Sequence, residues 1–204
     1  MMTIVDYGLG NIRAFVNVYE RLNLPVKIVT AAADLKGASK IILPGVGAFD
    51  QAMKQLNGSG MRDELEKQVL GNKVPFIGIC VGMQVLARSS EEGVLPGLGW
   101  IDGEVRKFDL SISSHKTVLP HMGWNTIAPL NGNALLNEFT ERSRFYFLHS
   151  FFVETNDQND TIATTEYVIR YTSALNHENI YGVQFHPEKS HRNGVQLLKN
   201  FADL

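Results

Sequence analysis

This 204-residue chain changes pattern most sharply within Val74-Pro75-Phe76-Ile77-Gly78-Ile79-Cys80-Val81-Gly82-Met83-Gln84. The apolar run at its start predicts a buried strand, and the spacing of apolar residues over 83–88 predicts a helix. Cys80, the only cysteine of the chain, lies where the strand stops. Glycines two positions to each side make this segment the thiol counterpart of the G-x-S-x-G turn, which exposes a nucleophile between a strand and a helix.

The position of Cys80 predicts a reactive thiol. The positive end of a helix dipole and the free N–H groups of its first turn favour the thiolate form. A lone cysteine is also compatible with a small buried apolar residue. The sequence around Cys80 alone therefore leaves both interpretations open.

Apolar runs alternate with helical patterns in the first half of the chain. Strands are expected at residues 3–7, 26–30 and 40–43, and helices at 12–22 and within 49–70. β-Rich segments dominate the second half, at 104–108, 145–154, 161–168 and 179–185, before a final helix at about 192–202. We therefore predict an α/β fold with a mostly parallel open sheet, helices on both faces, and an added antiparallel β portion in the second half.

Size and composition narrow the class of protein. A length of 204 residues with 44% hydrophobic residues predicts a single domain over residues 1–204. The formal net charge is -2 and the basic residues are scattered, which argues against a nucleic-acid partner. We expect a cytoplasmic protein without membrane association, because neither a signal segment nor an apolar stretch of membrane-spanning length is evident.

A second catalytic candidate lies near the C-terminus. Gln184-Phe185-His186-Pro187-Glu188 ends a predicted strand with a histidine and places a carboxylate two residues later. A thiol nucleophile needs a base, and the base needs an acceptor that orients its ring. Pro187 stiffens the link between His186 and Glu188. By itself the motif is also compatible with the end of an ordinary strand.

Two other motifs do not support a cofactor or a metal. Gly8-Leu9-Gly10 follows a strand, but Arg13 occupies the third glycine position of a dinucleotide-binding fingerprint. His186, Glu188 and His191 lack the spacing of a typical zinc motif. We expect neither a cofactor nor a metal. His121 and His149 have no carboxylate at comparable spacing, so we expect them to be structural or close to the site.

Motifs spread from residue 6 to residue 190 resemble a known family. They are Asp6-Tyr7-Gly8-Leu9-Gly10-Asn11, Pro44-Gly45-Val46-Gly47-Ala48-Phe49, Gly78-Ile79-Cys80-Val81-Gly82-Met83-Gln84, Pro120-His121-Met122-Gly123-Trp124-Asn125, Tyr146-Phe147-Leu148-His149-Ser150 and Gln184-Phe185-His186-Pro187-Glu188-Lys189-Ser190. The cysteine and histidine motifs resemble those of the class I (triad-type) glutamine amidotransferases. The full set resembles the glutaminase subunits of imidazole glycerol phosphate synthases.

The resemblance implies a catalytic triad. Cys80 would be the nucleophile, His186 the general acid and base, and Glu188 the group that orients His186. The tetrahedral oxyanion needs fixed hydrogen-bond donors. Donors for this oxyanion hole are expected from the N–H of Val81 and from the loop Gly45, Val46 and Gly47, and we expect the hole to be incomplete until a partner binds.

The resemblance also implies how glutamine is bound. Its substrate-binding residues would be Gly47, Gln84, Glu92, Ser150 and Phe151, the last two through their backbone. Gln84 lies one helical turn after Cys80 and can return to the same face. Glu92 would hold the α-amino group, with Glu91 as an adjacent competitor for that role.

A partner protein follows from the same resemblance. Asn11, Arg13, Met122 and Trp124 would lie at the interface with a (βα)₈-barrel cyclase or synthase subunit in a heterodimer. The barrel would receive ammonia directly through its core, forming imidazole glycerol phosphate and AICAR in histidine biosynthesis. Its nucleotide ligand would favour the active glutaminase state.

Three alternatives remain at the level of the sequence. The first is a paralogous glutaminase that supplies ammonia for amidino-sugar formation in surface polysaccharide (O-antigen) biosynthesis, because Val81 stands where leucine is commoner in the family. The second is a stand-alone γ-glutamyl hydrolase, against which the compact length argues. The third is a regulatory binding module with a dead site, disfavoured because all three triad residue types are present.

Overall fold

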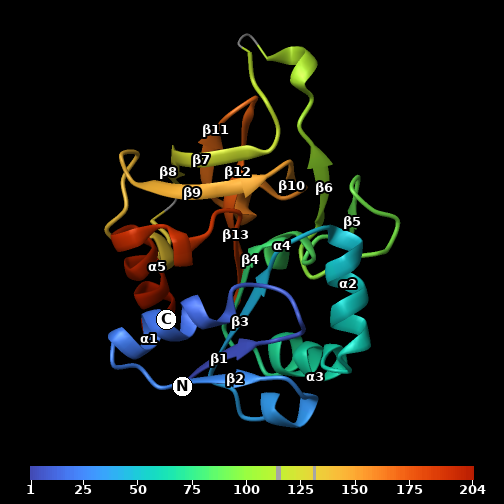
Figure 1. Cartoon of the computed structure of the whole chain (residues 1–204), viewed down its shortest axis with the longest axis vertical. Helices are drawn as coiled ribbons and strands as arrows, with labels where there is room; N and C mark the ends of the chain where they lie inside the picture. Colours follow the sequence, from blue (N-terminus) through green and yellow to red (C-terminus); the bar gives the residue numbers. More distant parts are fainter. Residues whose placement is uncertain (114–115, 131) are drawn as a thin grey trace.

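A mixed sheet runs through the centre of the molecule in the computed structural model, which describes residues 1–113, 116–130 and 132–204 (Figure 1). Its parallel half has the strand order β2, β1, β3, β4 and β13. These strands span Val26–Val29, Met2–Val5, Lys40–Gly45, Phe76–Cys80 and Ile180–Val183. All residues of β1 and β4 are buried, as expected of parallel strands that are covered on both faces.

Helices cover both faces of the parallel half (Figure 1). Helices α1 (Ile12–Arg21) and α5 (His191–Asp203) lie on one face. Helices α2 (Phe49–Gly58) and α3 (Arg62–Glu66) lie on the other, and α3 continues as a π-helical turn through residues 67–71. This arrangement confirms the predicted parallel sheet with helices on both faces.

The second half of the chain extends the sheet with mostly antiparallel pairs. Beyond β13 the order is β12, β10, β6 and β5, while β11 pairs with β12 and β8. These strands span Arg170–His177, Phe151–Thr155, Gly103–Lys107, Ser89–Ser90, Thr161–Glu166 and Ala128–Pro129. A separate ribbon is formed by β7 (His121–Thr126) and β9 (Arg144–His149). The predicted antiparallel addition is therefore confirmed.

The structure corrects one expected strand and contains others that the sequence did not indicate. The single strand expected at 145–154 is two strands, β9 and β10, which belong to different sheets and are separated at Ser150. Strands β7 and β12 were not expected. Their sequences mix polar and apolar residues without a clean alternation, so the pattern gave no strong strand signal.

The prediction of a helix over residues 83–88 is also wrong. Helix α4 covers only Val81–Gln84. The carbonyl groups of Val85, Ala87 and Arg88 accept hydrogen bonds from the N–H groups of residues 97–99, so the chain turns away instead of continuing the helix. The sharp turn over residues 78–82, which we call the elbow, is thus followed by a single helical turn.

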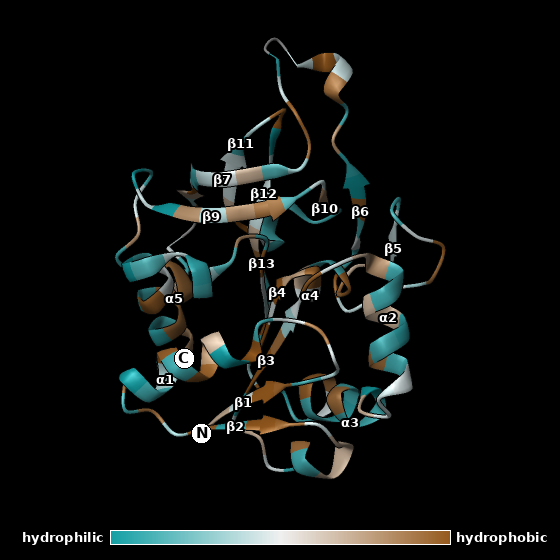
Figure 2. Ribbon diagram, viewed as in Figure 1, coloured by the Kyte–Doolittle hydropathy of each residue, from teal (hydrophilic) through white to brown (hydrophobic). Residues whose placement is uncertain are grey.

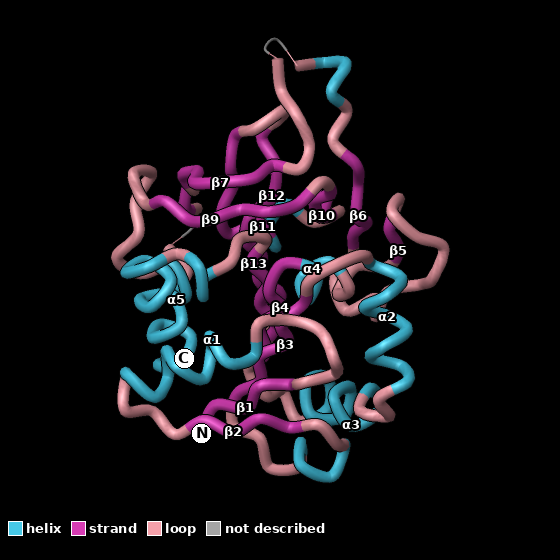
Figure 3. The backbone as a smooth tube through the Cα atoms, in the orientation of Figure 1, coloured by secondary structure: helices cyan, strands magenta, loops and turns pink. Residues whose placement is uncertain are grey.

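Hydrophobic residues gather on the central strands and on the inner sides of the helices, while the outer surfaces are hydrophilic (Figure 2). Buried residues from both halves of the chain form one hydrophobic cluster. A short 3₁₀ helix, Leu110–Ile112, stands on the segment that projects from the body between β6 and β7 (Figure 3). Among the described residues, no helix is both long enough and apolar enough to cross a membrane.

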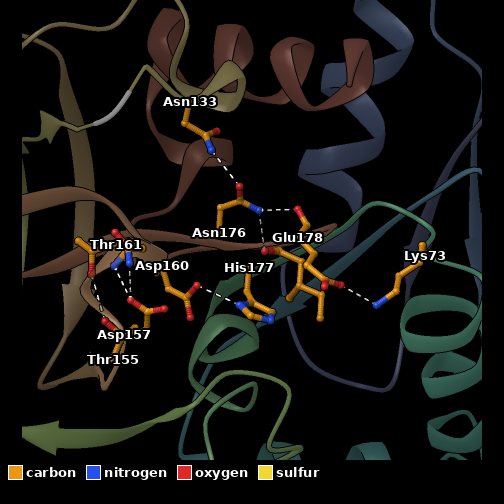
Figure 4. Close-up of polar contacts among 11 residues, drawn as sticks. Lys73, Asn133, Thr155, Asp157, Asp160, Thr161, Asn176, His177 and Glu178 are labelled. Carbon is orange, nitrogen blue, oxygen red and sulfur yellow. Dashed lines mark hydrogen bonds and ion pairs between the residues drawn. The ribbon is translucent and has the colours of Figure 1, made fainter.

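Polar contacts fix the turn that leads into β13 (Figure 4). The side-chain amide of Asn176 donates to the carbonyl groups of Glu178 and Ile180 at 2.8 and 3.1 Å. Glu178 also pairs with Lys73 at 2.6 Å, across the segment that precedes β4. These contacts tie β13 to the start of β4, so the opposite ends of both strands are held in register.

Candidate active site

Cys80 sits on a sharp turn between β4 and α4. Its backbone has φ 56° and ψ -111°, a conformation that residues other than glycine rarely adopt. A Cβ on Gly78 would overlap the carbonyl oxygen of Gly82, and a Cβ on Gly82 would overlap that of Leu43. The glycines therefore allow the close approach that this turn requires.

His186 and Glu188 reach the same place from the neighbouring strand. Strand β13 pairs in parallel with β4, and the chain after it continues into a 3₁₀ turn over Pro187–Lys189. Nδ1 of His186 lies 2.9 Å from Oε1 of Glu188, with only 3% and 2% of the two side chains exposed. Oε2 of Glu188 has no hydrogen-bond partner among the described residues. Among the described residues, the imidazole of His186 is therefore the hydrogen-bond partner of the Glu188 carboxylate.

The imidazole of His186 and the Cys80 side chain line the same cavity and interact electrostatically. Burial lowers the pKa of His186, but its interactions with Cys80 and Glu188 outweigh burial and raise the pKa above its usual value. A protonated imidazole beside the sulfur favours the thiolate. The structure thus brings the three predicted triad side chains together.

A cavity of about 280 Å³ opens beside the sulfur of Cys80. Its lining consists of Val46, Gly47, Cys80, Val81, Gln84, Glu92, Pro120, Leu148, His149, Ser150, Phe151, His186 and Lys189. The cavity lies at the small end of ligand pockets and suits an amino acid. Most residues predicted for the site line it, and Glu188 lies behind His186.

The loop predicted to supply oxyanion donors follows β3. Gly45 pairs with Cys80 in the sheet, and a Cβ on Gly45 would contact the backbone of Val81 and Gly82. Val46 and Gly47 line the cavity, and Gly47 has φ +92°. Gly45 therefore packs against the elbow, while the next two residues face the cavity.

The two adjacent glutamates of the 89–93 segment have different roles in the structure. Glu91 accepts from the backbone N–H of Lys107 at 2.6 Å and pairs with Arg106 at 3.2 Å, and these contacts lower its pKa. Glu92 lines the cavity, and its Oε2 accepts from the backbone N–H of Phe49 at 2.8 Å. Only Glu92 is thus available to a ligand in the cavity.

Gln84 lines the cavity but uses its amide donors inside the protein. Its Nε2 donates to the carbonyl of Phe151 at 3.0 Å and to Oε1 of Gln184 at 3.1 Å. Its Oε1 is therefore the atom that can accept from a ligand. The carbonyl of Ser150 accepts from the N–H of Phe108 at 3.4 Å.

His121 and His149 form a buried chain of hydrogen bonds with Tyr171. Nδ1 of His149 lies 2.7 Å from the Phe151 carbonyl and must donate to it, so its Nε2 accepts from the Tyr171 hydroxyl at 3.1 Å. The same hydroxyl accepts from Nδ1 of His121 at 3.1 Å. Burial lowers the pKa of His149 to about 3 and that of His121 to about 4, which keeps both rings neutral.

Residues predicted for a partner interface lie on the surface. Met122 and Trp124 are 62% and 39% exposed on β7, and Asn11 and Arg13 are exposed at the start of α1. The indole of Trp124 stacks on His191, with ring centroids 5.2 Å apart. His191 therefore faces Trp124.

Sequence reasoning missed several residues around the sulfur. Gln184 donates from Nε2 to Sγ of Cys80 at 3.8 Å, and the carbonyl of Leu148 lies 3.9 Å from Sγ. Gln184 lies two residues before His186, so strand periodicity was a usable signal. The buried Tyr7 hydroxyl, close to Gly45 and without a partner among the described residues, had no such signal.

Comparisons with known proteins agree with this geometry. The family model described as glutamine amidotransferase class-I matches residues 3–204. The chain is 54% identical to the imidazole glycerol phosphate synthase subunit HisH of Bdellovibrio bacteriovorus, over 100% of both chains. It is 50% identical to the subunit of the same name from Leptospira interrogans, again over 100% of both.

Solved structures share the fold at low sequence identity. A putative GMP synthase subunit from Thermoplasma acidophilum superimposes with a TM-score of 0.74 at 20% identity, covering 99% of this chain and 92% of that one. PurLQS from Thermotoga maritima gives 0.74 at 18% identity, covering 99% and 97%.

Proposed function

This chain belongs to the class I glutamine amidotransferases and, within them, to the HisH subunits of imidazole glycerol phosphate synthase, and from that membership we propose the chemistry of its site. The protein hydrolyses L-glutamine to L-glutamate and ammonia, with Cys80 as nucleophile. The observation that carries this proposal is the buried contact of 2.9 Å between Nδ1 of His186 and Oε1 of Glu188, beside the sulfur.

The reaction divides between two covalent steps. The Cys80 thiolate attacks the side-chain amide carbon of glutamine and forms a tetrahedral oxyanion. His186 then donates a proton to the departing nitrogen, and the C–N bond breaks. Ammonia is released, and a γ-glutamyl thioester remains on Cys80. In the second step His186 takes a proton from water, which attacks the thioester carbon, and glutamate and the thiolate are released.

The oxyanion is stabilised by backbone N–H groups at the mouth of the cavity. Val81 supplies one donor from the first turn of α4, and the loop of Gly45, Val46 and Gly47 supplies the other. Glycine on either side of Val46 permits a peptide rotation that completes the hole when a partner binds.

Glutamine is held by groups around the cavity. Glu92 binds its α-amino group as a charged acceptor, and Oε1 of Gln84 accepts from a substrate N–H. Gly47, Ser150 and Phe151 contribute backbone contacts. Because the carbonyl of Phe151 already accepts from His149 and Gln84, its contact to the substrate is made elsewhere on the backbone.

The partner is a (βα)₈-barrel synthase subunit, in a cytoplasmic heterodimer of which this chain is a single-domain half. The relatives are named as subunits of imidazole glycerol phosphate synthase, and exposed Met122 and Trp124 offer a partly apolar face beside the site. A barrel docked there, over Asn11 and Arg13 as well, receives ammonia before it is protonated in bulk water. The acceptor reaction forms imidazole glycerol phosphate and AICAR in histidine biosynthesis.

A coupled assay tests this function. Release of glutamate from glutamine is measured for the chain alone, with the barrel subunit from the same genome, and with that barrel and its nucleotide ligand. We expect low release alone and a marked increase in the liganded complex. Full turnover by the chain alone would contradict control by a partner, and equal activation by a barrel of a surface-sugar pathway would contradict the assigned acceptor.

A further inference from the structure

Gln184 is a buried residue that touches the sulfur of Cys80. Its side chain is fully inaccessible to solvent, and its Nε2 lies 3.8 Å from Sγ. We propose that Gln184 is a positioning residue that donates a hydrogen bond to the Cys80 sulfur and favours its thiolate form. The inference rests on the proposed role of Cys80 as nucleophile.

The topology brings these two residues to the same level of the sheet. Strands β4 and β13 run in parallel, with Ile79 opposite Val183. Cys80 and Gln184 are the next residues on the two strands. His186 follows Gln184 by two positions and lines the same cavity as Cys80. The segment that follows β13 thus brings both an imidazole and an amide to the side of Cys80.

The orientation of the Gln184 amide follows from its hydrogen-bond partners. The Phe151 carbonyl can only accept, so Gln84 must turn its Nε2 toward it. The same Nε2 meets the amide of Gln184 at 3.1 Å, so Gln184 must present its oxygen to Gln84. Its own Nε2 is thereby directed at the sulfur. A flipped Gln184 amide would set its Nε2 against Nε2 of Gln84, so Gln184 would lose this hydrogen bond and Gln84 would keep only the Phe151 carbonyl as an acceptor.

The start of this network is itself fixed. His149 donates from Nδ1 to the Phe151 carbonyl at 2.7 Å, and Tyr171 donates to the other ring nitrogen of His149. With the neutral His149 and Gln84 occupying both lone pairs of that carbonyl, rotation of either amide would break several hydrogen bonds at once. Gln184 therefore keeps its donor on the sulfur in both protonation states of Cys80.

Donation to sulfur has a chemical consequence. A hydrogen bond to an ionised acceptor is stronger than one to a neutral acceptor, most of all where water is excluded. The Gln184 amide therefore favours the thiolate over the thiol and adds to the effect of His186. It also holds the sulfur at a fixed point on the wall of the cavity.

Alkylation of Cys80 measures this effect directly, because the chain has no other cysteine. The rate of reaction with iodoacetamide is followed against pH for the wild type, Gln184→Met and Gln184→Glu. Met removes the whole amide. The Gln184→Glu variant retains an oxygen for Gln84 and replaces only the Nε2 donor. If one of the two Gln184 variants fails to fold, the other still tests the proposal. Gln68→Met is the matched control, since Gln68 is also buried and bonded at both ends of its amide, in the helix that follows α3.

We expect the midpoint of the alkylation profile to move upward by about one pH unit in Gln184→Met and further in Gln184→Glu, with no shift in Gln68→Met. An unchanged midpoint in folded Gln184 variants would overturn the proposal. The alkylation reports on the sulfur whether or not glutamine is turned over. A shifted profile in a protein that shows no glutaminase activity even with the liganded barrel would therefore contradict the proposed function while leaving the role of Gln184 intact.

Discussion

Nδ1 of His186 and Oε1 of Glu188 lie 2.9 Å apart, and both side chains are almost completely removed from solvent. The contact joins residues only two positions apart, across Pro187, which begins a 3₁₀ turn. Because the carboxylate accepts from Nδ1, the other ring nitrogen of His186 is directed at Cys80. The orientation of the base is thus set by a local feature of the chain.

Replacing Glu188 by glutamine tests this orienting role. The amide oxygen can still accept from Nδ1, but the negative charge that stabilises the imidazolium is lost. We expect kcat for glutamine hydrolysis in the complex to fall by about 100-fold or more, with little change in KM. Glu178→Gln, at the distant start of β13, is the control and should keep wild-type kcat; equal losses in both variants would argue against a specific role of Glu188.

Glu92 and its neighbour offer a matched pair for substrate binding. Glu92→Gln keeps an oxygen for the Phe49 N–H but removes the charge that faces the α-amino group of glutamine. We expect KM to rise at least about tenfold with a small change in kcat. Glu91→Gln, whose side chain turns to Arg106, should leave KM near the wild-type value. A larger effect at Glu91 than at Glu92 would reverse the assignment.

The geometry of the elbow predicts that alanine substitutions at two helical glycines change the free energy of unfolding by very different amounts. Gly82→Ala places a Cβ against the carbonyl oxygen of Leu43, so the strand and the turn must move apart. We expect a loss of about 1–3 kcal/mol in the free energy of unfolding, measured with urea, together with loss of activity. Gly58→Ala, where a Cβ would meet no atom within 4 Å, should be neutral or slightly stabilising. Equal stability of the two variants would contradict this account of the turn.

The buried histidines predict sensitivity to acid. The pKa of His149 is about 3 in the folded protein against an ordinary value of 6.5, so its contribution to stability is complete above pH 6.5 and is lost as the pH falls toward 3. This group alone should lower the free energy of unfolding by about 2 kcal/mol at pH 5. His121, with a pKa of about 4, acts in the same direction.

Urea denaturation between pH 5 and 8 measures this loss. His149→Gln should flatten the dependence on pH, because glutamine does not titrate. A stability profile that is flat over this range in the wild type would show that neither buried histidine resists protonation.

The parallel half of the fold was predictable because its strands are uniform apolar runs separated by amphipathic helices. Its register brings the ends of β4 and β13 together, whereas Cys80 and His186 were paired from the sequence by the needs of a thiol nucleophile and by the family resemblance. Strand β9 lies almost entirely within the segment expected to be a strand at 145–154, but its pairing with β7 was not predictable, since β7 mixes polar and apolar residues around Trp124 without a clean alternation.

The site was predictable where function depends on local motifs and not where it depends on packing. The glycines at positions 78 and 82 indicate the elbow from the sequence alone. The contact between Gln184 and Cys80 depends on register between distant strands, and the link from Gln184 to Gln84 depends on the orientation of two amides. Nothing in either segment alone specifies that orientation.

The central claim is that Cys80 performs the nucleophilic attack under the control of His186. Its most direct test is glutamate release by Cys80→Ala in the complex with the liganded barrel, with folding checked by circular dichroism and partner binding by size-exclusion chromatography. The account predicts a folded, partner-binding protein without detectable release. Release at a rate close to that of the wild type would contradict it.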